Sequence, residues 1–279
     1  MLVVVAMSSG SRWGIRLTLL MMLRVVTLHM STAHWCDVDH IPWSEDGKSV
    51  KIPVGCATSD DEAINLSAAS LGSRAVEILA AALATSRARR LILEDNHIGR
   101  KGAAALGALL AKNTRLISLD ISRNKIGDDG AREIAEGLRN NTHLRKLMLG
   151  DNGIGPHGAE AIAQAIGDGW RRENFDQISK LGKGKKVSGN FIVDLWLSFN
   201  PIGDGGAVVL AEILSGNTSV SGSGVVSDGT VGRPGVEQIF LAHCGIGNYG
   251  AASLGSALVL NPHMTNLVLI GNPVSVSIS

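Results

Sequence analysis

One recurring pattern limits what this chain can fold into. In residues 116–143, LISLDISRNKIGDDGAREIAEGLRNNTH, apolar residues alternate up to Asn124, which is the period of a strand with one buried face. A helical stretch then opens at Gly130, and its apolar residues follow at i, i+3, i+4 and i+7: Ala131, Ile134, Ala135 and Leu138. One strand and one helix cannot bury these faces alone, so copies must stack on one another. The pattern predicts an array of alternating strands and helices.

The copies can be counted from one landmark residue in each unit. The landmarks are Asn96, Asn124, Asn152, Asn200, Cys244 and Asn272. Three of their spacings are 28 residues, and the other two are 48 and 44. Leu or Ile stands five and three residues before every landmark, and Ile-Gly follows the first five. The sequence therefore predicts one array over residues 63–279, with a degenerate first unit and with insertions near 167–189 and 221–235.

The shared pattern LxLxxNxIGxxGAxxLAxxL resembles the leucine-rich repeat of the ribonuclease-inhibitor type. This is the repeat of ribonuclease inhibitor, NOD-like receptors and the Ran GTPase-activating protein, and the likeness covers roughly residues 63–273. The resemblance implies an α/β solenoid shaped like a horseshoe, with parallel strands on the concave side and helices on the convex side. It also implies that the landmark Asn side chains are buried against backbone groups, and that Cys244 is a buried structural thiol.

Residues 1–33 lie outside the array and resemble a secretory signal peptide. An apolar run at residues 17–23 lies between Arg16 and Arg24, and small residues end the segment at Ala33. An unstructured leader, or a start at Met7, is the alternative. The run is too short for a membrane span. Repeats of the resembled type are mostly intracellular, which favours the cytoplasm. Secretion would instead make Asn65, Asn140 and Asn217 glycan acceptors.

Residues 34–62 carry no repeat and predict an irregular cap over the first unit. Three alternatives stay open for this segment. Cys36 and Cys56 would form a disulfide in a secreted chain. His34, Cys36, His40 and Cys56 would supply zinc ligands, although their spacing matches no standard pattern. The two Trp residues of the segment would anchor a partner, although packing in a cap is the commoner role.

The two insertions differ in composition. The insertion near 167–189 carries six basic residues against three acidic ones and predicts a solvated loop, with contact to phosphate or to an acidic partner as the alternative. Its GKGKK stretch lacks the spacing of a phosphate-binding loop. The insertion near 221–235 is rich in Gly and Ser, which predicts a flexible segment.

The strand register predicts which side chains face the concave side. The central column is Ile92, Asp120, Met148, Trp196, Phe240 and Val268, and a neighbouring column includes Lys146, Asp194 and Gln238. Met148, Trp196 and Phe240 form an apolar stripe with polar margins, a composition typical of interaction hot spots. We expect a protein partner to bind there. The alternative is that these side chains pack on each other or are covered by the insertions.

Composition and motifs favour recognition over catalysis. The net charge is +1, with 26 basic and 25 acidic residues, so nothing global indicates nucleic acid. The eight His are scattered, and no catalytic order or metal motif is present. The sequence therefore predicts a non-enzymatic protein-binding module without cofactor or metal. A regulator of a small GTPase, resembling the Ran-activating family member, is the alternative. A fragment of a larger receptor is a third expectation, because the sequence ends at Ser279 without a helix to cover the last predicted strand.

Overall fold

The computed structural model describes residues 63–84, 86, 88–178, 192–215, 236–261 and 264–275, and only the backbone of 169–178. The predicted leader at 1–33, the cap at 34–62 with its Cys and His residues, and the insertion near 221–235 lie outside the described residues. Most of the basic residues of the insertion near 167–189 lie outside them as well.

Short strands and longer helices alternate along the described chain. The strands are β1 (Ala63–Asn65), β2 (Arg90–Ile92), β3 (Ser118–Asp120), β4 (Lys146–Met148), β5 (Asp194–Trp196), β6 (Gln238–Phe240) and β7 (Asn266–Val268). The helices are α2 (Gly72–Leu83), α3 (Gly99–Leu110), α4 (Gly127–Leu138), α5 (Pro156–Ile178), α6 (Gly203–Ser215) and α7 (Asn248–Leu260).

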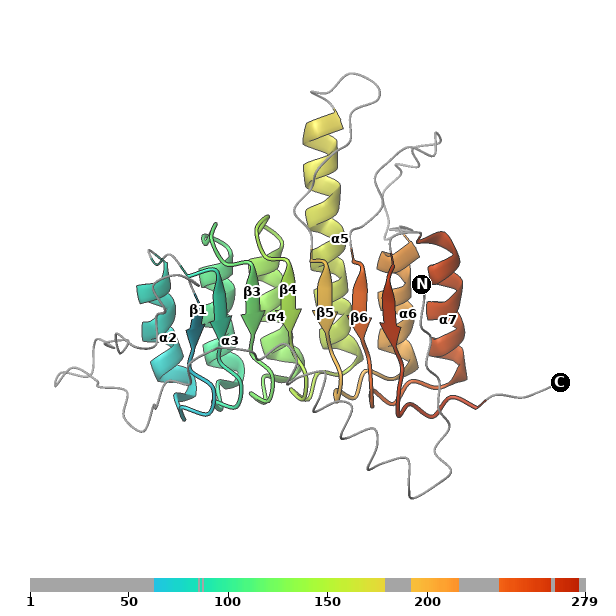
Figure 1. Cartoon of the computed structure of the whole chain (residues 1–279), viewed down its shortest axis with the longest axis horizontal. Coiled ribbons are helices and arrows are strands. Elements are labelled where there is room, and N and C mark those ends of the chain that lie inside the picture. The colour runs from blue at the N-terminus through green and yellow to red at the C-terminus, as the bar shows by residue number, and fades with distance from the viewer. Residues whose placement is uncertain are drawn as a thin grey trace.

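The strands form one parallel sheet in which each strand pairs with the next one along the chain, in the order β1 to β7. Figure 1 shows the strands side by side in one row, with the helices in a second layer behind them. Each helix connects two parallel neighbours, which is the connection that parallel pairing requires. The predicted α/β repeat solenoid is confirmed.

The two insertions do not change the register of the sheet. Leu91 pairs with Leu119, Leu119 with Leu147, Leu147 with Leu195, Leu195 with Ile239, and Ile239 with Leu267. These residues all stand five positions before their landmarks. The additional residues of the two long units therefore lie outside the strands, and every strand keeps the same residues facing the helices.

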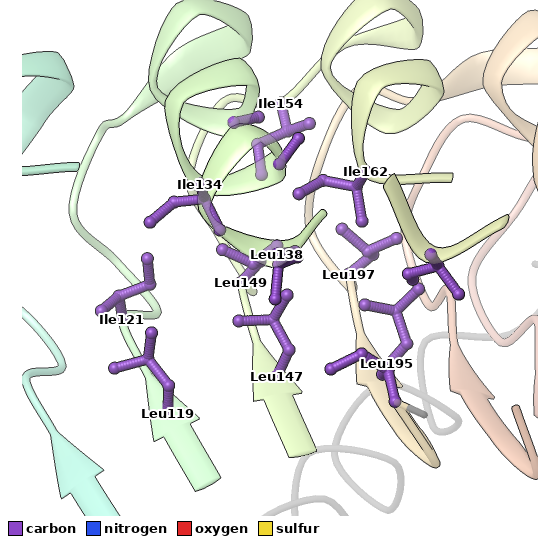
Figure 2. Close-up of a cluster of buried hydrophobic side chains, with 14 of the residues drawn as sticks. Leu119, Ile121, Ile134, Leu138, Leu147, Leu149, Ile154, Ile162, Leu195 and Leu197 are labelled. Carbon is purple, nitrogen blue, oxygen red and sulfur yellow. The ribbon is translucent and has the colours of Figure 1, made fainter. Parts of the chain in front are cut away.

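The core lies between the sheet and the helices. Leu119 and Ile121 of one unit, Ile134 and Leu138 of α4, and Leu147 and Leu149 of the next unit belong to one buried cluster, and the next units repeat the arrangement (Figure 2). Leu119, Ile121 and Ile134 are fully buried. Burying one such side chain contributes roughly 1.5–3 kcal/mol, and the contribution recurs in every unit. The stacking of units therefore stabilises an array whose single units could not fold alone.

Two helices differ from the sequence prediction. Helix α4 begins at Gly127 rather than Gly130, and its first turn carries Asp128 and Asp129, which suit the positive end of a helix. Helix α5 continues to Ile178, so the prediction of a loop is wrong for residues 167–178. The segment from Trp170 to Ile178 contains no Gly or Pro, and nothing in its composition ends the helix. Within the described chain, no helix combines the length and the apolar character that crossing a bilayer requires.

Candidate functional site

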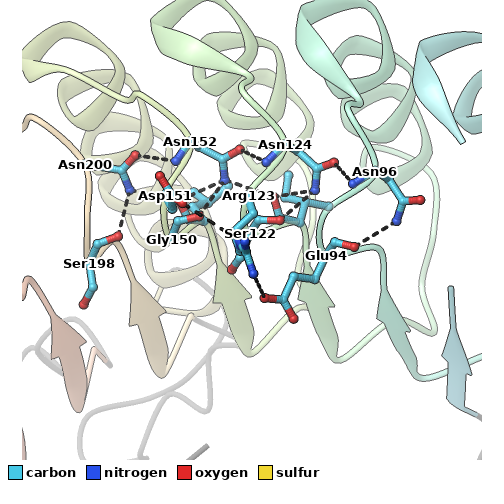
Figure 3. Close-up of polar contacts among 12 residues, drawn as sticks. Glu94, Asn96, Ser122, Arg123, Asn124, Gly150, Asp151, Asn152, Ser198 and Asn200 are labelled. Carbon is cyan, nitrogen blue, oxygen red and sulfur yellow. Dashed lines mark hydrogen bonds and ion pairs between the residues drawn. The ribbon is translucent and has the colours of Figure 1, made fainter. Parts of the chain in front are cut away.

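The landmark residues fasten each unit to the next at the turn that follows the strand (Figure 3). Asn124 Nδ2 donates to the carbonyls of Ile121 and Ser122 in its own unit, and to that of Leu93 in the preceding unit, each at 2.9 Å. Its Oδ1 accepts from the backbone N–H of Asn96 at 2.9 Å. Asn96, Asn152, Asn200 and Asn272 bond to backbone groups at the equivalent turns in the same way. These contacts fix the turns from which the outward side chains project.

Cys244 takes the landmark place in the unit of β6. Its Sγ lies 3.3 Å from the Leu197 carbonyl and 3.5 Å from the Ala242 carbonyl, to which the thiol can donate. Burial raises the pKa of the Cys244 thiol to about 11. The group is therefore a protonated thiol at neutral pH, held inside the turn, and it is a poor nucleophile there.

The predicted central column lies in register on adjacent strands. Pairing brings Ile92 beside Asp120, Asp120 beside Met148, Met148 beside Trp196, Trp196 beside Phe240 and Phe240 beside Val268. Lys146, Asp194 and Gln238 form the neighbouring column in the same register. The residues between the two columns are fully buried toward the helices, so both columns lie on the opposite side of the sheet. We call this side the strand face.

The centre of the strand face is a stacked aromatic pair. The ring centroids of Trp196 and Phe240 are 4.0 Å apart, with an interplanar angle of 28°. Lys146 Nζ lies 4.9 Å from the Trp196 ring centroid and 3.8 Å from an Asp194 carboxylate oxygen. The side chains therefore pack on each other, as one alternative from the sequence expected. Both rings nevertheless remain partly exposed, and so does Met148 beside them.

A second aromatic stack flanks the first and was missed by the sequence reasoning. The rings of Phe199 and His243 are 4.9 Å apart and nearly parallel, at 12°, and Phe199 is 50% exposed. Both residues stand directly before a landmark and have left-handed backbone, with φ of 63° and 54°. Strand alternation says nothing about a turn residue. The available signal was the column one position before the landmarks, which changes from charged residues in the early units to rings in these two.

The other half of the strand face is charged. Asp120 is only 8% exposed, and its Oδ1 accepts from the backbone N–H of Ser122 at 3.0 Å. Arg123 lies 3.9 Å from a Glu94 oxygen and 4.0 Å from an Asp151 oxygen (Figure 3). Burial raises the pKa of Asp120. Burial, and then the neighbouring Asp120 carboxylate, raise the pKa of Glu94.

Outside the strand face, the described residues offer few metal-binding or titratable groups of note. Within the ranges that the structure describes, no three His, Cys, Asp or Glu side chains gather as a metal ion would require. The only side chains with a raised pKa among the described groups are Glu94, Asp120 and Cys244. The arrangement on the strand face can therefore supply ring surfaces, a buried carboxylate and ion pairs, which are the components of a contact surface.

The comparison with protein families gives the same answer as the fold. The family model described as Leucine Rich repeat matches at residues 89–107, 112–135, 140–163 and 190–211. These matches fall on four successive strand-and-helix units, β2 to α6. The chain contains leucine-rich repeats over residues 89–211, and its alternating strands and helices fit a leucine-rich-repeat solenoid. Leucine-rich repeats are commonly modules for protein–protein interaction, and proteins of this family are generally not enzymes. A comparison with curated proteins found no match to this chain.

Proposed function

We propose that this leucine-rich repeat protein binds a protein partner on its strand face, through Trp196, Phe240 and Met148, and that it catalyses no reaction. The observation that carries the proposal is the stacked pair at the centre of the face, whose rings stay partly exposed among polar neighbours. In the horseshoe of the ribonuclease-inhibitor type, to which we assign the 28-residue units, this face is the concave side.

The composition of the face supports a recognition role. Large aromatic side chains that are ordered before binding lose little conformational freedom on binding, and they dominate the energy of many protein interfaces. The Trp196 ring is already held in place by Phe240 on one side and by Lys146 near its face. Lys146, Asp194 and Gln238 supply a polar margin along the stripe. A preorganised apolar centre with a polar rim is the usual anatomy of an interface.

The remaining predicted residues of the site take lesser roles in this proposal. Ile92 and Val268 are the end positions of the central column, on either side of the apolar and charged residues between them. Asp120 lies between Ile92 and Met148 and separates the apolar stripe from the first position. No contact among the described residues favours a GTPase regulator or a receptor fragment over a general binding module.

A capture experiment with the full chain tests the proposal. The immobilised protein is exposed to a cell lysate, and the retained proteins are identified by mass spectrometry. The Trp196→Ala, Phe240→Ala variant should lose specific partners, because each truncated hot-spot side chain costs about 2 kcal/mol or more in binding, which is roughly a thirtyfold weaker affinity.

The matched control truncates two exposed side chains away from the face. Tyr249 and Val259 on α7 are 70% and 84% exposed, so the Tyr249→Ala, Val259→Ala variant removes similar apolar surface elsewhere. It should retain the partners of the unmodified protein. Circular dichroism checks that both variants are folded. Retention of every specific partner by the folded Trp196→Ala, Phe240→Ala variant would refute the proposed site.

A further inference from the structure

Carboxylates outnumber cations on one half of the strand face, where Arg90, Arg123 and Lys146 are the basic residues. Near β2, β3 and β4 the face and its adjoining turns carry four carboxylates, which we call the acidic patch: Glu94, Asp95, Asp120 and Asp151. On the other side of β4 the central column is apolar, from Met148 through Trp196 to Phe240. Lys146 stands at the border, within 3.8 Å of Asp194 and 4.9 Å of the Trp196 ring.

Arg123 neutralises the acidic patch only in part. Arg123 approaches Glu94 and Asp151 only to 3.9 and 4.0 Å, and its side chain is 56% exposed. Exposed pairs at such distances contribute little, because solvent screens them. Asp120 accepts a backbone hydrogen bond from Ser122, and Lys146 is the smallest of the influences on its pKa. Burial is the largest cause of the raised pKa of Asp120 and of Glu94, so a cation brought beside them would favour their charged forms.

We infer that the partner presents an extended segment in which a Lys or Arg lies about three residues from a bulky apolar side chain. The basic group would meet the acidic patch, and the apolar group would rest on the Trp196–Phe240 stack. This inference rests on the proposed function, and it adds the chemical character of the partner. Opposite charge across an interface favours the right partner and disfavours acidic ones.

The spacing follows from the sheet. Asp120 and Trp196 occupy the same column on β3 and β5, with only β4 between them. Neighbouring strands are about 4.8 Å apart, so the two side chains project from positions roughly 10 Å apart. An extended chain in the polyproline II conformation has three residues per turn and rises about 3.1 Å for each, so side chains three residues apart lie on one side of the chain and roughly 9 Å apart.

Short fluorescein-labelled peptides test the inference on the full chain by fluorescence anisotropy. One peptide carries Arg three residues before Phe in a Gly/Ser background. In the others, Gln or Glu replaces Arg, or Ser replaces Phe. We expect the Arg/Phe peptide to bind about tenfold more tightly than the Gln/Phe peptide in low salt, and the Glu/Phe peptide to bind most weakly of the three. The difference should shrink between about 25 mM and about 300 mM NaCl.

Two variants locate the effect. The Glu94→Gln, Asp120→Asn variant should lose most of the preference for the Arg/Phe peptide over the Gln/Phe peptide, and the amide oxygen that it introduces at position 120 can still accept from the Ser122 N–H. The matched control is Asp129→Asn, Glu133→Gln, which removes one Asp and one Glu that pair with Arg100 on the helix side. It should retain the preference for Arg.

The outcomes separate this inference from the proposed function. Equal binding of the Arg/Phe and Glu/Phe peptides, lost in Trp196→Ala, would overturn the partner chemistry and leave recognition by the strand face in place. Preference for the Glu/Phe peptide would overturn it as well. If none of the four peptides binds, the inference that the partner presents an extended basic segment is wrong. The capture experiment then tests the proposed function by itself.

Discussion

The two halves of the strand face share one backbone and differ in chemistry. Around β2 and β3, Glu94, Asp120 and Arg123 form a charged surface in which carboxylates predominate. Around β5 and β6, Trp196 stacks on Phe240, and Phe199 stacks on His243 in the adjoining turns. The strands beneath both halves pair in the same register, and their inward Leu and Ile side chains are equally buried.

The difference between the two halves shows which positions of a repeat are free to vary in chemistry. The inward and landmark positions are occupied by similar residue types in both halves, because every unit must bury its strand and close its turn. The outward positions carry no such requirement. They are therefore free to differ from one unit to the next, and a site can be assembled from them without disturbing the fold.

The largest expected effects test whether the halves share one core. Leu119 lies under the charged half and Leu195 under the aromatic half, and both are fully buried. Leu119→Ala and Leu195→Ala should each lower the free energy of unfolding by about 2–5 kcal/mol, because each leaves a cavity in the stack. Urea denaturation measures both. A small effect for either variant would show that the core does not continue under that half.

A smaller loss of stability is expected when a landmark residue is truncated, and it should differ between Asn152 and Cys244. Asn152 Nδ2 donates to the carbonyls of Ile121 and Leu149, and its Oδ1 accepts from the Asn124 N–H. Asn152→Ala leaves these buried groups unpaired and should cost about 3 kcal/mol of stability. Cys244 offers only a weak thiol donor, so Cys244→Ala should cost about 1 kcal/mol. Urea denaturation measures both variants. An equal loss of unfolding free energy in the two would show that the hydrogen bonds of Asn152 do not stabilise its turn more than the Cys244 thiol stabilises its own.

The smallest effect concerns the charged half alone. The pKa of Asp120 is raised above its ordinary 3.8 by burial, so the folded state favours the protonated form. The stability due to this group is complete below about pH 4 and is lost as the pH rises through the raised pKa. Asp120→Asn should therefore raise the melting temperature at pH 7 relative to the unmodified protein, and the gain should vanish toward about pH 4.

Asp129→Asn on α4 is the control for this pH dependence, because Asp129 is exposed and pairs with Arg100 and Arg132. It should not raise the melting temperature at pH 7. A destabilised Asp120→Asn variant at pH 7 would mean that the charge of Asp120 is used inside the fold, and that it is not held ready for a partner.

Much of the fold could be predicted from the sequence, because the same residue pattern recurs in several units. The positions of Leu119, Asn124 and Ile134 within one unit predicted the strand, the turn and the helix of the other units. The central column of the candidate site followed from the same register, since strand alternation decides which side chains point away from the helices. The role of that column in binding remains a prediction.

The tertiary structure decided what depends on contacts between units. Asp128 Oδ1 accepts from the backbone N–H groups of Gly155 and Gly158 at the start of α5, and Asp204 does the same for Gly247 and Gly250 at the start of α7. No pattern within a single unit predicts a cap supplied by the preceding one. The stacking of Phe199 on His243 was likewise hidden.

The physical reason is the range of the forces involved. Periodic apolar residues fix the strands, the helices and the buried faces, because burial depends on the local spacing of side chains along one element. The pairing of rings and the compensation of charges depend on distances of a few ångströms between residues about 28 or more positions apart. The sequence by itself therefore determined the scaffold and the direction of its side chains. Only the folded arrangement decided that the Trp196 and Phe240 rings stack on each other and that Arg123 pairs with both Glu94 and Asp151.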